Sequence, residues 1–580
     1  MSGQSSYWDK VLSRRITRRR ALAATGTSAA AAAFLAACGG DDDGGDATTG
    51  GGSTAEPTSS SGQAAVDPTE GIQGGKIVIQ SFGDPGGSLE LIKIRNYGVH
   101  QFAGFTHDGL LEFDNGTKGT DGYNLLPKPN LAQAMPEQAD ELTYIYKLRP
   151  AKFHDGTDLT SADVKYSYEA FAASDAYASL WFWLDHVEVP DPETAVVKTK
   201  IPYADALQSM AARYDSEILS QAHHESGKGE TELMGSGPFL FGEYQQPVRS
   251  TYLRNPNYHR QPYPYFDEVE LLGNADVEKE ISDFVSGQVH MTYWFQSEDR
   301  DRIQAARPDG VLFNYTNGGP FVILRNDVAP FSDARVRRGL SYAMDRAAIS
   351  EVMTGGEGEP DQAISQTGRY WEFRKPSELG ESAKYWEYNI AEAKKLLEAA
   401  SVSLPMEFSM PHFDPTVVGQ KFVDGAVLTQ SRWKSEGIAD VTDVNLTYAD
   451  YSATLARGDY ENVCWAYMTV GYAPTIGSAL KNYYWSPPEG AQLAPTLNVA
   501  HVHIPELSAL LDKQMGQLDK AARIETFRAI EDVIADQQCV LSTNTDPLNY
   551  FADPKVENMQ IPREAYNGGL PYVKYWWFPA

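Results

Sequence analysis

The chain has 580 residues, of which 42% are hydrophobic and 22% charged, and its formal net charge is −29. At roughly 150 residues per domain, this length predicts about three or four structural units, and the apolar content is enough for folded cores. The acidic balance argues against a nucleic-acid-binding protein, because such proteins neutralise phosphate with Lys and Arg. The three cysteines exclude a disulfide-rich scaffold.

The start of the chain differs from the rest in charge. Residues 1–37 contain six basic side chains and one acidic side chain, a local +5, so the remainder carries −29 minus +5, or −34. The basic residues 14–20 precede the Ala-rich stretch 21–37, which is the pattern of an export signal. Residues 17–22, with Arg18 and Arg19, resemble a twin-arginine signal. An ordinary secretory signal with additional arginines is the alternative.

The segment after the Ala-rich stretch indicates an anchor. Residues 35–38 (Leu-Ala-Ala-Cys) resemble a bacterial lipobox, which implies cleavage before Cys38 and lipidation of its thiol. The following residues, rich in Gly, Ser, Thr and Asp, cannot bury enough apolar surface to fold. We therefore predict a signal peptide over 1–37 and a lipidated, flexible tether over 38–73.

The body of the chain begins with strand patterns. The β-branched run 76–80 predicts a buried strand, and the alternation over 141–148 predicts a half-buried strand with Leu142, Tyr144, Tyr146 and Leu148 on one face. Residues 154–157 predict a turn.

Helix patterns follow, each with a capping residue. Thr160 with Asp163 forms a capping box before a helix whose Val164, Tyr168 and Phe171 share a face. Further amphipathic helices are predicted after Asp333 (Val336, Leu340, Ala343, Met344), after Asn389 with Glu392 (Ala393, Leu396, Leu397, Ala400), at Leu507, Leu510 and Leu511, and at Ile524, Phe527, Ile530 and Ile534. Beyond the N-terminus no uninterrupted apolar run of about 18 residues predicts a membrane span. Interspersed strands and helices indicate a mixed α/β class.

Five blocks in this order resemble the extracytoplasmic solute-binding proteins of family 5, the dipeptide/oligopeptide-binding group that feeds ABC importers. The resemblance covers about residues 75–575. The blocks are 131–164, 235–239 with 254–258, 286–291, 330–346 and 389–397. We interpret most of these residues as structural scaffold rather than as ligand contacts. We expect Gly235 and Gly237 to allow close backbone approach at a crossover between lobes.

The resemblance implies a bilobal periplasmic-binding-protein-like α/β fold, with two lobes joined by two crossing strands and a subdomain inserted in lobe I. Solute would be enclosed as the lobes close about a hinge, and an ABC permease in the membrane would recognise the closed form. The expected divisions are lobe I at 74–116, 235–320 and 540–580, the inserted subdomain at 117–234, and lobe II at 321–539.

The resemblance also indicates solute-contacting residues. The family places an aromatic side chain against the ligand at the position of Trp465, and Tyr467 is a further aromatic candidate in the same stretch. Three residues later, peptide binders carry an Asp for the ligand's ammonium, whereas this chain has Met468, and residues 462–488 contain no Asp or Glu. Aromatic residues here, among them Tyr472, Tyr483, Tyr484 and Trp485, suit uncharged solutes such as oligosaccharides, or a peptide held by its backbone.

Three further residues are candidates for solute contact. Arg369 and Trp371 lie in a lobe II loop where family members touch ligand, and Arg369 could pair with a carboxylate. Phe82, after the first strand, would form a wall in lobe I. Residues 181–183 (Trp-Phe-Trp) are expected in the core of the inserted subdomain instead.

Other chemistries lack their motifs in this sequence. There is no GxSxG, P-loop, dinucleotide fingerprint or HExxH, and the two close His pairs, at 223–224 and 501–503, have no third ligand at a metal-binding spacing. We therefore expect a binding protein without cofactor or metal, and the resemblance implies a monomer. An exported hydrolase or a surface sensor on the same fold is the alternative. Cys464 and Cys539 are expected either as free buried thiols or as a pair.

Overall fold

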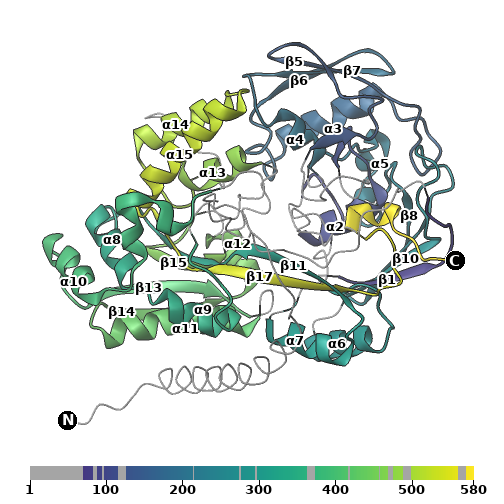
Figure 1. Ribbon diagram of the computed structural model, residues 1–580. Coiled ribbons are helices and arrows are strands. Elements are labelled where there is room, and N and C mark those ends of the chain that lie inside the picture. The colour runs from purple at the N-terminus through teal and green to yellow at the C-terminus, as the bar shows by residue number, and fades with distance from the viewer. Residues whose placement is uncertain are drawn as a thin grey trace, which may run out of the picture.

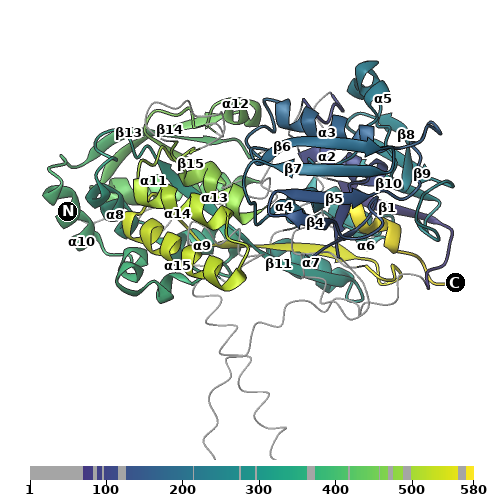
Figure 2. The ribbon, with the colours of Figure 1, turned by 90° about the horizontal axis from the view of Figure 1, so that it is seen from above.

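The computed structural model describes most of the chain. The described residues are 70–81, 88–93, 97–114, 126–212, 215–273, 276–293, 295, 297–361, 373–415, 419–455, 458–467, 475–487, 498–559 and 570–580. They build two lobes that lie side by side (Figure 1, Figure 2). One hydrophobic core uses residues between 77 and 313 together with Met515 and 550–577, and the other uses residues between 321 and 541.

The first lobe is built on a four-stranded sheet in the order β1-β10-β9-β8. β1 pairs with β10 in parallel and the other neighbours are antiparallel. The strand predicted at 76–80 is confirmed as β1, in which Ile77 and Ile79 are fully buried. The elements of this lobe are β1 (Lys76–Ser81), α2 (Tyr97–Thr106), β2 (Leu111–Phe113), β3 (Pro127–Pro129), β8 (Phe239–Gln245), β9 (Arg249–Arg254), β10 (Glu268–Gly273), α6 (Val277–Val285), α7 (Ser297–Ala306) and the 3-10 helix η7 (Leu570–Tyr575).

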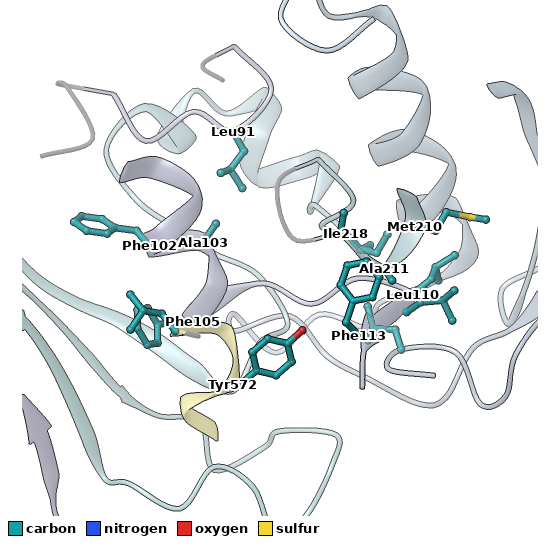
Figure 3. Close-up of a cluster of buried hydrophobic side chains, with 14 of the residues drawn as sticks. Leu91, Phe102, Ala103, Phe105, Leu110, Phe113, Met210, Ala211, Ile218 and Tyr572 are labelled. Atoms are coloured by element: carbon teal, nitrogen blue, oxygen red, sulfur yellow. The ribbon is translucent and has the colours of Figure 1, made fainter. Parts of the chain in front are cut away.

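The core of this lobe joins parts of the chain that are far apart in the sequence. In Figure 3, Phe105 of α2 lies near Tyr572 of η7, Phe102 lies farther along the same helix and points away from Tyr572, and Phe113 of β2 lies near Ile218. All five side chains are buried. The first lobe is therefore complete only after the chain has passed through the second lobe and returned.

A second antiparallel sheet, ordered β4-β5-β7-β6, belongs to the same core. The predicted capping box is confirmed, since the Asp163 carboxylate accepts the Thr160 N–H at 2.8 Å at the start of α3. The prediction for Leu142 is wrong: it precedes β5 and is exposed, because the chain turns there. The elements are β4 (Glu137–Asp140), β5 (Thr143–Lys147), α3 (Ser161–Ala173), β6 (Leu184–Asp191), β7 (Thr194–Thr199), α4 (Ala206–Ala211), α5 (Gln221–Glu225) and the 3-10 helix η1 (Lys228–Glu230).

The second lobe contains an antiparallel sheet, β15-β12-β16, and a parallel pair, β13-β14. Its helices α8 and α10 begin as predicted, with the side chains of Asp333 and Asn389 accepting backbone N–H groups. The elements are β12 (Pro320–Leu324), α8 (Ala334–Tyr342), α9 (Arg346–Thr354), η3 (Pro376–Glu378), η4 (Gly380–Trp386), α10 (Ile390–Ala399), β13 (Met406–Phe413), α11 (Gln420–Ser435), β14 (Ala439–Leu446), α12 (Tyr448–Ala453), β15 (Val463–Tyr467), α13 (Ile476–Tyr484), α14 (Pro505–Met515), α15 (Lys520–Gln537) and β16 (Val540–Ser542).

Helix α8 is shorter than predicted. It ends at Tyr342, so Ala343 and Met344 lie beyond it, although both are buried in the core of the second lobe. The predicted helices at 507–511 and 524–534 are confirmed as α14 and α15.

Two crossing strands join the lobes. β11 (Val311–Gly318) pairs antiparallel with β17 (Thr545–Ala552), and both run from one lobe toward the other in Figure 1. β11 continues into β12 through Gly319, and β16 leads into β17 through Thr543 and Asn544. A Cβ atom on Gly319 would lie 2.0 Å from the Asn544 carbonyl oxygen, so only glycine fits there. The lobes therefore meet at a tight crossing.

The expected role of Gly235 and Gly237 is half right. Both allow close approach, because a Cβ atom on either would lie within 2.5 Å of the Thr106 backbone. The approach, however, is internal to the first lobe, at the end of α2, and the crossing between lobes is made by β11 and β17. Within the described residues, no helix is long and apolar enough to cross a membrane.

Candidate functional site

Strand β15 carries the predicted aromatic contact to a position beside the crossing. Its Val, Trp and Tyr residues favour an extended strand. The register pairs Trp465 with Val322 and Tyr467 with Pro320 of β12. β15 therefore ends next to the point where the chain passes between the lobes.

Trp465 is fully buried in the second lobe. Its ring lies 6.2 Å from that of Phe422, and a Cβ atom on Gly425 of α11 would lie 3.0 Å from its Cζ2 atom. Its indole N–H has no hydrogen-bond acceptor within the part of the chain that the structure describes. An unpaired buried donor costs about 1–3 kcal/mol. The indole N–H is thus a donor without an acceptor among the described residues, and contact with solute stays a prediction.

The other predicted contact residues have no described side chain. Tyr467 is placed only as the last residue of β15. Phe82, Arg369, Trp371, Met468 and Tyr472, and the predicted lipidation site Cys38, lie outside the described residues.

The aromatic residues at the end of α13 pack within the protein. Tyr484 is fully buried in the core of the second lobe, and burial raises the pKa of its hydroxyl. The indole N–H of Trp485 donates to Asp512 at 2.8 Å. Their pattern in the sequence suggested solute contact, but in the structure they support α13 and α14.

The lobes touch at a contact that the sequence did not reveal, which we call the α4 contact. It consists of Phe182, Tyr203, Ala204 and Asp205 of the first lobe, and Thr475, Gly477, Lys481, Gln514, Met515 and Arg523 of the second. Asp205, the residue before α4, receives hydrogen bonds from both Nη atoms of Arg523, each at 2.6 Å. Both side chains are only 5% exposed. Arg523 also donates to the Gln514 side-chain oxygen at 2.8 Å and 3.1 Å.

Backbone and aromatic groups complete this contact. The Ala204 N–H donates to the Met515 carbonyl at 2.8 Å, and Met515 packs into the core of the first lobe. The hydroxyls of Tyr203 and Thr475 are 3.2 Å apart. Tyr203 is held from behind by stacking on Trp183, with the ring centroids 5.4 Å apart.

Tyr203 ends a column of aromatic rings in the first lobe. Trp183 stacks on Trp181 at 5.0 Å, and Trp181 stacks on Phe171 at 6.3 Å. Trp181 and Trp183 are buried, so the prediction that 181–183 belong to a core is confirmed for both indoles. Phe182 instead faces the second lobe, where it meets Lys481.

Lys481 lies between two aromatic rings, one from each lobe. Its Nζ atom is 4.2 Å from the ring centroid of Phe182 and 4.2 Å from that of Trp485. Burial lowers the pKa of the Lys481 ammonium, and the negative charge of Asp512 partly offsets this. Ammonium–ring attraction contributes on the order of 1 kcal/mol at partly desolvated sites.

A second contact, the α7 contact, joins the lobes on the other side of the crossing strands (Figure 1). Both Nη atoms of Arg300 on α7 donate to the Glu357 carboxylate at 2.8 Å, and Ser297 donates to it at 2.7 Å. Lys421 of α11 pairs with Glu298 at 3.0 Å. These side chains are more exposed, at 17% for Arg300 and 31% for Glu357.

The cysteines and possible metal ligands do not form a reactive centre among the described residues. Cys464 and Cys539 are buried and unpaired, and burial raises the pKa of both thiols, that of Cys539 to about 11. A thiol rather than a thiolate is a poor nucleophile. No three His, Cys, Asp or Glu side chains in the described ranges are arranged to hold a metal ion. His224 instead pairs with Glu90 at 2.7 Å.

Comparison with known proteins identifies the family. Residues 127–484, more than half of the chain, match the family model described as bacterial extracellular solute-binding proteins, family 5 Middle. The oligopeptide-binding protein AppA of Bacillus subtilis is 23% identical over 87% of this chain and 92% of its own length.

Solved structures share the fold at low sequence identity. The periplasmic binding protein DppA of Helicobacter pylori, in complex with the peptide STSA, is 18% identical with a TM-score of 0.73, covering 88% of this chain and 99% of that one. AgaA of A. tumefaciens R10, in complex with agropinic acid, is 23% identical with a TM-score of 0.72, covering 87% and 99%. The chain thus belongs to the bacterial extracellular solute-binding proteins of family 5.

Proposed function

We propose that this protein captures a peptide between its two lobes and delivers it to an ABC permease in the membrane. The observation that carries the proposal is the crossing of β11 and β17, which joins two lobes with separate cores in a chain of this family. Such an arrangement allows closure about a hinge, and closure is driven by the difference in solute affinity between the two states. Members of the family are solute-binding components of transport rather than enzymes.

The choice of peptide rests on the relatives. AppA is named for oligopeptides, and DppA holds the peptide STSA. An uncharged solute such as an oligosaccharide is the second candidate. It is favoured by Met468 at the position where peptide binders carry Asp, and by the lack of Asp and Glu in 462–488. Burying an ammonium without a counter-ion costs several kcal/mol.

Native mass spectrometry of the freshly purified protein separates these candidates. We expect a bound species whose fragmentation gives amino-acid residues. Fragmentation into hexose units would establish the second candidate. If nothing co-purifies and no peptide or sugar library shifts the unfolding temperature, the solute-binding proposal fails.

For the solute site, we propose Trp465 and Tyr467 of β15 with Met468 and Tyr472, together with Phe82, Arg369 and Trp371. Trp465 supports this through its position beside the crossing and its unpaired indole N–H. Trp465→Phe keeps an aromatic ring in the core and removes only the donor, so we expect about a tenfold loss of solute affinity. Unchanged affinity in a folded Trp465→Phe protein would remove the indole N–H from the site.

The lobe boundaries are part of the proposal. We place lobe I at 74–116, 235–320 and 540–580, its inserted subdomain at 117–234, and lobe II at 321–539. The two separate cores and the close approach at Gly319 and Asn544 support the separation of the two lobes, although Val540 and Leu541 of β16 pack in the core of the second lobe. Limited proteolysis tests it, since cleavage at a boundary should leave each core protected.

We also propose export by a twin-arginine signal and anchoring through lipid on Cys38 at the outer face of the membrane. The residues at 17–22 and 35–38 support this. Partition into Triton X-114 detergent should be lost in Cys38→Ala, and export should be lost when Arg18 and Arg19 are changed to Lys. Export that survives the Lys changes would point to the ordinary secretory route.

A further inference from the structure

The α4 contact differs from a chance meeting of surfaces in the way its charges are paired. The carboxylate of Asp205 meets the guanidinium of Arg523 with two parallel hydrogen bonds, which is the strongest geometry for such a pair. Gln514 accepts from the same guanidinium and fixes its orientation. Both charges are almost completely removed from water. An ion pair held in this way specifies one relative position of the two lobes.

The contact is also packed so closely at one position that a residue larger than glycine would displace its neighbours. A Cβ atom on Gly477, at the start of α13, would lie 2.9 Å from the Asp205 carboxylate oxygen. The other atoms near it are the ends of the Gln514 and Arg523 side chains, at 3.0 Å and 3.4 Å. All three neighbours are side-chain ends of one hydrogen-bond network, and only Asp205 comes from the other lobe. We call the arrangement in which the lobes meet at the α4 contact closed. A methyl group at 477 therefore conflicts mainly with this closed arrangement.

Each group in the contact is satisfied by another protein group. Asp205 pairs with Arg523, Tyr203 meets Thr475, the Ala204 N–H reaches Met515, and Lys481 lies between Phe182 and Trp485. None of these interactions requires a solute atom. In Figure 1, α4 lies beside α13 and α14, on the side of the crossing strands away from α7.

We propose that the α4 contact is a latch that populates the closed arrangement before solute binds, with Asp205, Arg523 and Gly477 as its determining residues. The consequence for affinity rests on the proposed solute-binding function. Apparent affinity falls in proportion to the fraction of molecules that are competent to bind. The latch also sets how far apart the lobes stand when they are closed. Its residues therefore limit the size of the solute that fits between them.

The test measures closure without solute, in the full-length chain carrying Cys38→Ser. Spin labels are attached to cysteines introduced at Asp158 in the first lobe and Glu381 in the second, whose side chains are 76% and 100% exposed. The native Cys464 and Cys539 are buried and should stay unlabelled. Protein freed of solute by unfolding and refolding is examined by pulsed electron paramagnetic resonance, which gives the distribution of distances between the labels.

We expect a major population at the distance of the closed structure, and at least a tenfold fall in the closed-to-open ratio in Gly477→Ala and in Asp205→Asn. Gly477→Ala removes no charge and favours the helix, so a folding defect would not explain its effect. The control is Asp553→Asn, which removes the charge from a partly buried ion pair with Arg307 inside the first lobe and should leave the distances unchanged.

Two results would overturn the latch. One is a solute-free wild-type protein without the closed distance, and the other is an unchanged distribution in Gly477→Ala and Asp205→Asn. Neither result bears on the solute found by mass spectrometry, so failure of the latch and failure of the proposed function are distinguishable.

Discussion

The two contacts between the lobes use the same chemistry in different surroundings. Each contains an arginine that holds a carboxylate with two hydrogen bonds, Arg523 on Asp205 and Arg300 on Glu357. The first pair is 5% exposed on both sides, and the second is 17% and 31% exposed. The α4 contact also includes backbone and aromatic groups, whereas the interactions that we find across the α7 contact come from side chains that water can reach.

Burial of an ion pair has little effect on the net stability that the intact pair provides, but it raises the cost of losing one partner. Removing two charges from water costs about as much as their attraction returns, so an intact buried pair adds little net stability. Breaking it by removing one partner leaves an uncompensated charge, which is costly. A solvent-exposed ion pair contributes about 1 kcal/mol or less to stability. The α4 contact should thus fix the position of the lobes, and the α7 contact should only assist.

The largest difference should appear when one partner is removed from each pair. Asp205→Leu leaves Arg523 buried and should disfavour closure by about 3–5 kcal/mol, and the double variant Asp205→Leu/Arg523→Leu should recover most of it. Glu357→Leu should cost about 1 kcal/mol or less. Titration with the co-purified solute measures these changes. Equal losses in the two single variants would remove the distinction between the contacts.

The next effect concerns Glu280 on α6, the helix that packs against α7. Burial, with Asp276 and Asp283 nearby, raises the pKa of Glu280 on α6 to about 7 from an ordinary 4.5. The folded protein therefore binds more protons than the unfolded chain between these values, and stability falls as pH rises from about 4.5 to about 7, by up to about 3 kcal/mol.

Hydrogen exchange of α6 and α7 measures this loss, with α13 and α14 as the internal reference. Glu280→Gln should remove the pH dependence, since its amide does not ionise. A wild-type protein whose α6 and α7 exchange equally at pH values of about 4.5 and about 7, relative to α13 and α14, would contradict the expectation.

Salt concentration should also distinguish the α4 contact from the α7 contact, but by a smaller effect. Raising the salt concentration to about 1 M shortens the screening length to about 3 Å, which weakens exposed pairs more than buried ones. We expect faster exchange at Glu357 and at the start of α11, by up to about 1 kcal/mol of protection, and little change at Asp205. A larger change at Asp205 than at Glu357 would show that water reaches the buried pair.

The smallest effect should come from Lys481. Since burial lowers its pKa, the closed arrangement disfavours the ammonium, and closure should become slightly more favourable as pH rises toward 10.5. Lys481→Met should change closure by about 1 kcal/mol or less and abolish this slope. Pulsed resonance distances at two pH values measure it. A closed fraction that falls with pH would mean that attraction to the two rings outweighs burial.

The sequence predicted features whose causes are local. Thr160 with Asp163, Asp333 and Asn389 each cap a helix within three residues, so their roles could be read from spacing alone. Errors arose where an element ends. Leu142 continued an alternating pattern into a turn, because periodicity does not register where the pairing partner stops.

The α4 contact could not be read from the sequence. Asp205 and Arg523 are separated by 318 positions, and each belongs to a helix region with an ordinary polar pattern. Gly477 looked like any glycine near a helix start, because its requirement comes from a carboxylate on the other lobe. For the solute site, the family resemblance supplied Trp465, but the pattern did not distinguish it from Tyr484, which is also fully buried.

The position of Lys481 between Phe182 and Trp485 gives the protein an intrinsic optical probe. The emission energy of an indole depends on the charges and water around it. In the closed arrangement Trp485 has a cation over its ring and a carboxylate on its N–H. Opening withdraws Phe182 and admits water to the same ring. The opening and closing of the lobes should therefore be visible as a shift in tryptophan fluorescence, without any dye.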